Sequence, residues 1–144
     1  ALDAAARNFD LNLGHPAVAA TRHEQIVGNA FDELARLNAE GRGFDMVILD
    51  PPAFAKTQAE TAGALAAYAR LTRLGVSVLR PGGVLVQASC SSRVDADAFF
   101  QAVNRAAAGV GRPLREIERT GHALDHPVRF REGAYLKCLF ATAE

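Results

Sequence analysis

A carboxylate followed by two prolines marks the first stretch of the chain whose residue types could carry chemistry. Asp50 follows the apolar run Phe44–Leu49, and Pro51 and Pro52 stop that run because proline cannot donate to a sheet. The run predicts a strand buried on both faces of a parallel sheet. Ligands of such sheets bind beyond the carboxyl ends of the strands, so Asp50 is a candidate site residue. A plain Asp-Pro-Pro turn is the alternative interpretation.

A thiol follows the second apolar run. Cys90 comes two residues after Val84–Ala88 and has serine neighbours at positions 89, 91 and 92. Because these serines indicate a polar strand end, Cys90 is a candidate reactive thiol, although free cysteine is also a common small buried residue. The other cysteine, Cys138, lies in the apolar stretch Tyr135–Ala141 and is expected in the core.

The spacing of apolar residues predicts the elements that position these groups. Helices are expected over Ala1–Leu13, Asp32–Asn38, Thr57–Arg80 and Asp95–Ala108, and strands over Glu24–Val27, Phe44–Leu49, Val84–Ala88, Leu114–Thr120 and Ala134–Ala141. This alternation predicts an α/β fold with a doubly wound, mainly parallel sheet. Only a polar loop, Gly121–Glu132, separates the last two strands, so the final strand is expected to be antiparallel.

Length and composition predict one domain and exclude several classes of protein. The chain has 144 residues, 49% of them hydrophobic, which is enough for one core. Its 16 basic and 16 acidic residues cancel, so the overall charge indicates neither a nucleic-acid nor a membrane partner. Two cysteines without metal-ligand spacing predict a reducing, cytoplasmic setting and no metal site. No run has transmembrane length, and no targeting segment is recognisable.

Three motifs together resemble a known enzyme family. They are DPPAFAK at 50–56, LRPGGVLVQASCSS at 79–92 and DHPVRFREGAYLK at 125–137. In this order they are similar to the catalytic domain of class I S-adenosylmethionine-dependent methyltransferases, and more narrowly to the bacterial 23S ribosomal RNA cytosine-5 methyltransferases. The resemblance implies a Rossmann-like fold, S-adenosylmethionine (SAM) as cofactor and ribosomal RNA as partner.

The first two strands of the family, with their glycine-rich cofactor loop, have no counterpart in this chain. The chain also opens inside a helical pattern without a capping residue. We therefore expect residues 1–144 to be the C-terminal part of a single catalytic domain from a longer protein. Without those strands, Phe44–Leu49 is expected to be an open apolar edge, at which two copies could pair into a homodimer.

The resemblance also implies a role for each residue of the substrate site. Cys90 is the nucleophile that adds to carbon-6 of a cytosine and so activates carbon-5 for methylation. Asp50 binds the polar edge of the flipped base, and Phe54 stacks on it. Pro51 and Pro52 present their backbone to the same base. An anchor for the loop is an equally good interpretation of Phe54.

The cofactor residues implied by the resemblance are Asn29, Ala30 and Phe31, and Asp50 contributes from the neighbouring strand end. Asn29 is expected to contact the adenine, while Ala30 and Phe31 line its ring. As an alternative, Asn29 caps the helix that follows it.

Two other functions stay open on the sequence. A methyltransferase that acts on a ring nitrogen or an exocyclic amine needs no thiol, so Cys90 would be dispensable. A non-catalytic fragment would instead self-associate through its open sheet edge. Five basic residues form either a phosphate-binding set or an ordinary solvated surface: Lys56, Arg93, Arg129, Arg131 and Lys137.

Overall fold

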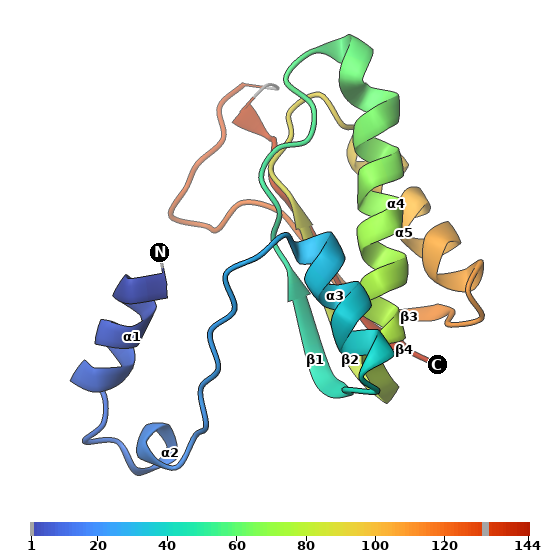
Figure 1. The fold of residues 1–144 in the computed structure, drawn as a ribbon. Helices are drawn as coiled ribbons and strands as arrows, with labels where there is room; N and C mark the ends of the chain where they lie inside the picture. Colours follow the sequence, from blue (N-terminus) through green and yellow to red (C-terminus); the bar gives the residue numbers. More distant parts are fainter. Residues whose placement is uncertain (1, 131–132) are drawn as a thin grey trace.

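The computed structural model describes residues 2–130 and 133–144, and its centre is a mixed sheet (Figure 1). The strands are β1 (Phe44–Leu49), β2 (Leu79–Ser89), β3 (Leu114–Thr120) and β4 (Lys137–Ala143). Among the described residues they form one four-stranded sheet in the order β1-β2-β4-β3. β1 pairs with β2 in parallel, and β4 runs antiparallel to both of its neighbours, so β1, β2 and β3 share one direction. The α/β class and the antiparallel final strand are confirmed.

Three helices lie together on one side of this sheet (Figure 1). α4 (Thr61–Ser77), which follows the short 3-10 helix Gln58–Glu60, packs between α3 (Ala30–Ala39) and α5 (Ala96–Ala108). α3 and α5 agree with the helices expected at 32–38 and 95–108 to within two residues at each end. Asn29 and Asp95 start these two helices by accepting backbone N–H groups of the first turn, which explains why both helices begin where they do.

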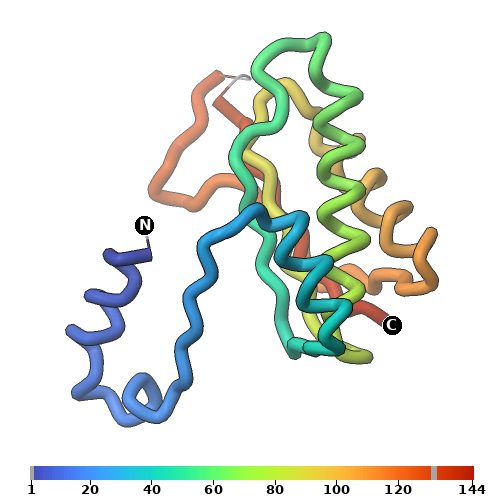
Figure 2. The backbone as a smooth tube through the Cα atoms, in the orientation of Figure 1, coloured from blue at the N-terminus to red at the C-terminus, as the bar shows by residue number. Residues whose placement is uncertain are grey.

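The first part of the chain stands apart from the sheet (Figure 2). α1 (Leu2–Leu11) and α2 (Pro16–Ala19) contain no buried residue, and the start expected at Ala1 lies outside the described residues. The strand expected at Glu24–Val27 is wrong: this segment is exposed and pairs with no strand of the described sheet. A strand needs a neighbour for its backbone hydrogen bonds, and apolar character alone does not supply one. Within residues 2–130 and 133–144, no helix has both the length and the apolar character needed to cross a membrane.

The junction between α4 and β2 also differs from the expectation. The helix expected to run to Arg80 ends at Ser77, and β2 already begins at Leu79. Leu79 pairs with Phe44 and Val84 pairs with Met46, so the Pro-Gly-Gly step at 81–83 bulges out between paired residues. Gly82 supplies a positive φ of 74° there, which a larger residue would adopt only under strain. The two glycines therefore interrupt a strand, not a helix. β4 is likewise displaced, beginning three residues after the expected Ala134.

One face of β1 is exposed, and the expectation that both faces are buried is wrong. Val47 and Leu49 point into the core, whereas Met46 is 53% and Ile48 66% exposed. Successive residues of a strand face opposite sides, and the packed helices lie on only one of them. β1 is also one of the two edge strands of the described sheet. The open apolar edge expected from the sequence is thus present in the described residues.

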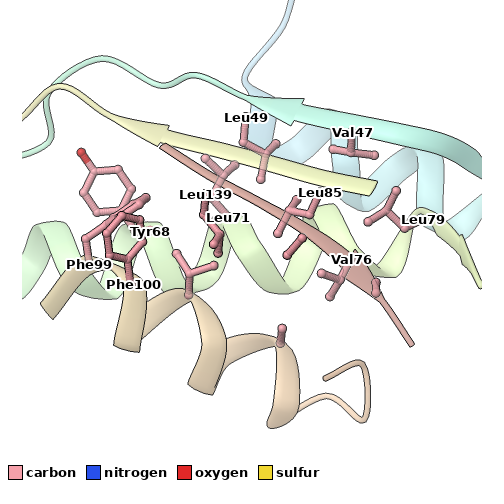
Figure 3. Packing of buried hydrophobic residues seen from close by; sticks show 14 of the residues in the cluster. Val47, Leu49, Tyr68, Leu71, Val76, Leu79, Leu85, Phe99, Phe100 and Leu139 are labelled. Atoms are coloured by element: carbon pink, nitrogen blue, oxygen red, sulfur yellow. The ribbon is translucent and has the colours of Figure 1, made fainter. Parts of the chain in front are cut away.

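The core forms where α4 and α5 meet the inner face of the sheet (Figure 3). Tyr68, Phe99 and Leu139 are fully buried, and the rings of Tyr68 and Phe99 meet edge to face at 5.1 Å. Burying a side chain such as Phe99 or Leu139 stabilises the fold by about 1.5–3 kcal/mol. The polar side chains in this core are paired, since Thr72 Oγ1 donates to Gln87 Oε1 at 2.8 Å.

Arg112 joins the start of β2 to the end of β4. Its Nε donates to the carbonyl of Glu144 at 2.8 Å, and its Nη1 and Nη2 donate to the carbonyls of Leu79 and Arg80 at 3.1 and 3.2 Å. A planar guanidinium can serve three acceptors at once because its N–H groups are fixed in a fork. At the end of the sheet opposite to Asp50 and Cys90, one side chain therefore holds the backbones of β2 and β4 together.

Two glycines of α4 offer a matched test of how closely the helix approaches the sheet. A methyl group at Gly75 would lie 2.9 Å from Leu49 Cδ1, whereas nothing lies within 4 Å of one at Gly63. In a helix, alanine is favoured over glycine by about 1 kcal/mol, but overpacking a core costs about 1–3 kcal/mol. We expect Gly63→Ala to raise the free energy of unfolding in urea and Gly75→Ala to lower it. A stabilising Gly75→Ala would contradict the close packing of α4 on β1.

Candidate functional site

The carboxyl ends of the parallel strands β1 and β2 lie at the same end of the sheet (Figure 1), and Asp50 and Cys90 follow these two ends. β1 and β2 are parallel, and Leu49, the last residue of β1, is the partner of Gln87 in β2. Asp50 follows β1 directly and Cys90 follows β2 directly, so both leave the carboxyl ends of neighbouring strands. Asp50 is exposed and Cys90 is half-buried. A ligand that approaches this edge can therefore meet a carboxylate and a thiol.

A buried hydrogen bond joins the two loops that carry these groups. The hydroxyl of Ser91 donates to the carbonyl of Ala55 at 3.0 Å, and both residues are almost completely shielded from solvent. Ser91 follows Cys90, and Ala55 lies in the loop that begins with Asp50. Breaking this bond would leave a buried carbonyl without a partner, which costs about 1–3 kcal/mol. The positions of the two loops are therefore coupled.

Tyr68 of α4 supports both loops from the side of the core. The Ser89 hydroxyl donates to the Tyr68 hydroxyl at 2.8 Å and accepts the backbone N–H of Ser91 at 3.3 Å. The ring of Tyr68 also packs against Phe54 with 4.9 Å between the ring centroids. Burial raises the pKa of Tyr68, so its hydroxyl stays protonated well above neutral pH. Sequence reasoning missed this role, although the single tyrosine in an otherwise aliphatic helical stripe was a signal.

Phe54 links the expected substrate residues to the expected cofactor residues. It is half-buried, and its ring centroid lies 6.3 Å from that of Phe31, over which the guanidinium of Arg70 lies at 4.7 Å. These contacts support the alternative interpretation of Phe54 as an anchor for its loop. Stacking on a base stays a prediction, as do the contacts expected of Pro51, which is half-buried, and Pro52, which is exposed.

Asn29 caps α3, as the alternative interpretation predicted. Its Oδ1 accepts the backbone N–H of Phe31 at 3.0 Å. Ala30 is the first residue of the helix and is exposed, and Phe31 is half-buried. The three residues thus form one short surface next to the loop of Phe54. Contact between this surface and an adenine stays a prediction.

The expectation that Cys138 lies in the core is wrong. It lies on the open face of the sheet and is half-buried, because its neighbours in β4, Lys137 and Leu139, are the residues that face the helices. It pairs with Ala88 of β2 and Thr120 of β3. Burial raises the pKa of the Cys138 thiol, and the negative charge of Asp50 raises it further. Burial and the nearby carboxylate therefore both favour the protonated form of this second thiol.

A hollow of about 450 Å³ lies beside the segment that follows Cys90. It is lined by residues 92–96 and by Gln58, Ala134, Leu136 and Lys137. Within residues 2–130 and 133–144, no group of three or more His, Cys, Asp or Glu side chains is placed to hold a metal ion. The hollow itself is a polar recess, and it borders the segment that follows Cys90.

Four of the five basic residues lie in the described part of the chain, and not all of these four face solvent. Lys137 is buried and donates to backbone carbonyls, so its expected place among solvent-facing phosphate contacts is wrong. Lys56, Arg93 and Arg129 are exposed, and Arg131 lies outside the described residues. A lysine in the apolar stretch Tyr135–Ala141 was the available sign that its charge is needed inside the fold.

The chain is similar in sequence to curated ribosomal RNA large subunit methyltransferases. It is 42% identical over 140 residues to the ribosomal RNA large subunit methyltransferase of Deinococcus radiodurans, covering 97% of this chain and 33% of that protein. It is 41% identical over 115 residues to ribosomal RNA large subunit methyltransferase I of Shewanella amazonensis, covering 78% of this chain and 29% of that protein. The chain thus spans about a third of the length of these relatives. No known family profile matches it. The resemblance inferred from the three motifs is confirmed at the level of ribosomal RNA large subunit methyltransferases, and the cytosine-5 specificity stays a prediction.

Solved structures share its fold. A methyltransferase in complex with S-adenosylhomocysteine superposes with a TM-score of 0.71 at 19% identity, covering 94% of this chain and 36% of that one. A methyltransferase homologue from Pyrococcus horikoshii superposes with a TM-score of 0.60 at 18% identity, covering 94% of this chain and 49% of that one. At these identities the likeness concerns the fold, and it confirms the Rossmann-like arrangement.

The raised pKa of Cys138 predicts slow alkylation of this thiol. In the Cys90→Ala variant, where Cys138 is the remaining thiol, we expect iodoacetamide at pH 7.5 to react about tenfold more slowly than with the same variant unfolded in urea. The rate should keep rising into a pH range where that of the unfolded chain has levelled off, because a raised pKa delays formation of the thiolate. Asp50→Asn should speed the reaction. Equal rates in the folded and unfolded chains would contradict the assignment.

Proposed function

We propose that the protein transfers a methyl group from SAM to ribosomal RNA. The proposal is based on the alignment of 97% of this chain's length with a ribosomal RNA large subunit methyltransferase. More narrowly, we propose carbon-5 of a cytosine as the acceptor and Cys90 as the nucleophile. The observation that supports this most directly is the thiol of Cys90 and the carboxylate of Asp50 at one sheet edge, on loops joined by the Ser91–Ala55 hydrogen bond.

The proposed chemistry starts from the weak nucleophilicity of carbon-5. The Cys90 thiolate forms a bond to carbon-6 of the cytosine, and the electron pair of the 5,6 double bond becomes available at carbon-5. Carbon-5 forms a bond to the methyl group as the bond from that group to the sulfonium sulfur of SAM breaks, which leaves S-adenosylhomocysteine. The carbon-5 proton then passes to water, the electron pair of that C–H bond restores the 5,6 double bond, and the carbon–sulfur bond to Cys90 breaks to free the thiolate. During these steps the carboxylate of Asp50 would accept a hydrogen bond from the amino group or the ring nitrogen of the cytosine. This bond would fix which face of the base is presented to Cys90.

The residues present are compatible with SAM as the methyl donor. Asn29 uses only Oδ1 in capping α3, and its amide nitrogen has no hydrogen bond among the described residues, so it can donate to an adenine. Ala30 is exposed beside it, and the half-buried ring of Phe31 offers an apolar surface. When bound, SAM supplies an electrophilic methyl group. Asp50, which follows β1, would contribute to the same cofactor site.

The length of the relatives supports a wider proposal about the protein. Since the chain matches about a third of each of them, we propose that residues 1–144 are the C-terminal part of one catalytic domain in a longer protein. Ribosomal RNA as partner fits a cytoplasmic location, as does the small number of cysteines.

Self-association is the second candidate. Its support is the edge position of β1, where Met46 and Ile48 are exposed on an apolar strand. Unpaired strand edges of this kind pair with other chains, so two copies of the chain would form a homodimer without any catalysis. A methyltransferase acting on a ring nitrogen or an amine is a third candidate, and it differs from the first in needing no thiol.

Calorimetric titration with SAM tests the cofactor and the extent of the domain together. We expect a longer form of the protein, extended upstream by the two strands that the family resemblance implies, to bind SAM with micromolar affinity, and the 144-residue chain to bind at least about tenfold more weakly. Equal binding by both would mean that this chain holds the whole cofactor site. Binding by neither, with a dimer seen in sedimentation, would favour self-association.

The two cysteines provide a matched test of the nucleophile. In the longer protein we expect Cys90→Ala to reduce methyl transfer to ribosomal RNA by about a thousandfold or more, with SAM affinity unchanged, because only the covalent step is lost. Cys138→Ala should keep transfer within about threefold. Full activity of the Cys90→Ala variant would contradict the cytosine carbon-5 mechanism and favour a ring nitrogen or amine as acceptor.

A further inference from the structure

Lys137 is a buried lysine whose hydrogen-bonding capacity is fully used. It is 4% exposed, and its Nζ donates to the carbonyls of Ser91 at 2.6 Å, Val94 at 2.7 Å and Tyr135 at 3.1 Å. An ammonium group has three N–H donors, so all of them are engaged by backbone acceptors. None is left for solvent or for a phosphate. The side chain therefore acts on the protein's own backbone.

The place of Lys137 in the sheet explains which backbone it reaches. It is the first residue of β4 and pairs with Ser89, the last residue of β2. Its side chain shares the helix-facing side with Leu139, so it extends past the end of β2 on the inner side. The acceptors it meets there, Ser91 and Val94, both belong to the segment that follows Cys90.

Burial and two nearby groups affect the pKa of Lys137. Burial lowers the pKa of this lysine, while the charges of Asp95 and of a Cys90 thiolate act in the opposite direction. An apolar side chain at this place would avoid the cost of burying an ammonium group. However, a neutral side chain would leave two or three of the carbonyls of Ser91, Val94 and Tyr135 without a hydrogen-bond donor. The choice of lysine is therefore accounted for by the segment it binds, not by packing.

We propose that Lys137 is a positioning residue for methyl transfer, because its ammonium group fixes the segment Ser91–Val94 and thereby the place at which the Cys90 thiol is presented. The inference rests on the proposed function of Cys90. Lys137 itself does not touch substrate or cofactor. It acts from the core side on the backbone that begins one residue after the nucleophile, and it complements the Ser91–Ala55 bond, which holds the same segment to the loop of Asp50.

Two substitutions separate the hydrogen bonds of Lys137 from its bulk. Lys137→Met keeps an unbranched side chain, one atom shorter, and removes every donor, whereas Lys137→Gln keeps an amide with two N–H donors. The control is Lys56→Gln, because Lys56 is the other lysine of the chain and is exposed.

Amide hydrogen exchange in the 144-residue chain reads out the segment directly. We expect Lys137→Met to raise exchange at Ser91 and Val94 about tenfold, with Lys137→Gln in between and amides of central β2, such as Val86, changed less than about twofold. Lys56→Gln should change none of them. Uniform acceleration at all amides would mean that Lys137 serves only global stability, and an unchanged segment would mean that it does not hold Ser91–Val94; either result overturns the proposal.

Kinetics of the longer protein test the catalytic consequence. We expect Lys137→Gln to lower kcat for RNA methylation about tenfold or more, with KM for SAM changed less than about twofold, because displaced reacting atoms slow the chemical step without weakening cofactor binding. A kcat that is unchanged per folded molecule would overturn the proposal. Failure of the proposed function is seen separately, as methylation that survives Cys90→Ala.

Discussion

The parallel pairing of β1 with β2 is the constraint on which the rest of this structure depends. Two parallel strands end at the same edge, so the groups that follow them, Asp50 and Cys90, are brought together without any direct contact between them. Parallel strands also require a crossover, and α4 supplies it. The helix that makes the connection is thus also the helix against which the sheet packs.

The crossover explains how the reactive edge is supported. The loop that starts at Asp50 leads into α4, and Tyr68, two turns along, contacts Phe54 in that loop and Ser89 at the end of β2. Next to the ends of β1 and β2, the core is therefore polar. Hydroxyl, amide and ammonium groups form hydrogen bonds there, where the rest of the core has aliphatic side chains. Among the described residues no buried side-chain nitrogen or oxygen lacks a partner. Such a network favours one arrangement of the loops, since displacing any member leaves another unsatisfied.

The sequence predicted the elements that carry local patterns and failed where tertiary context decides. β1 and β3 were predicted to the residue, because each is a short strand between clear breakers. The segment Glu24–Val27 has strand character but no partner, and Pro81-Gly82-Gly83 has breaker character but lies inside a strand, and neither outcome is visible in a local window.

The candidate site divides in the same way. The strand-end positions of Asp50 and Cys90 follow from apolar runs and their breakers, so they were accessible from the sequence. The hydrogen-bond partners of Tyr68 and Lys137 were not, because the spacing of a helix or strand assigns a residue to a face and says nothing of what its polar tip will meet. Ser91 was noticed only as one of three serines, and its burial is a property of the assembled loops.

The hydrogen bonds of Arg112 help to fix the register of β4 in the sheet. A shift of β4 by one residue would turn Leu139 away from the core and Phe140 toward it. Every side chain of the strand would then face the opposite side of the sheet. Such a shift would also carry the carbonyl of Glu144 away from Arg112 at one end and the ammonium group of Lys137 away from its acceptors at the other. A misaligned β4 would lose contacts at both ends at once. The chain is left with a single alignment of β4, and in it the segment that follows Cys90 keeps its contacts with Lys137.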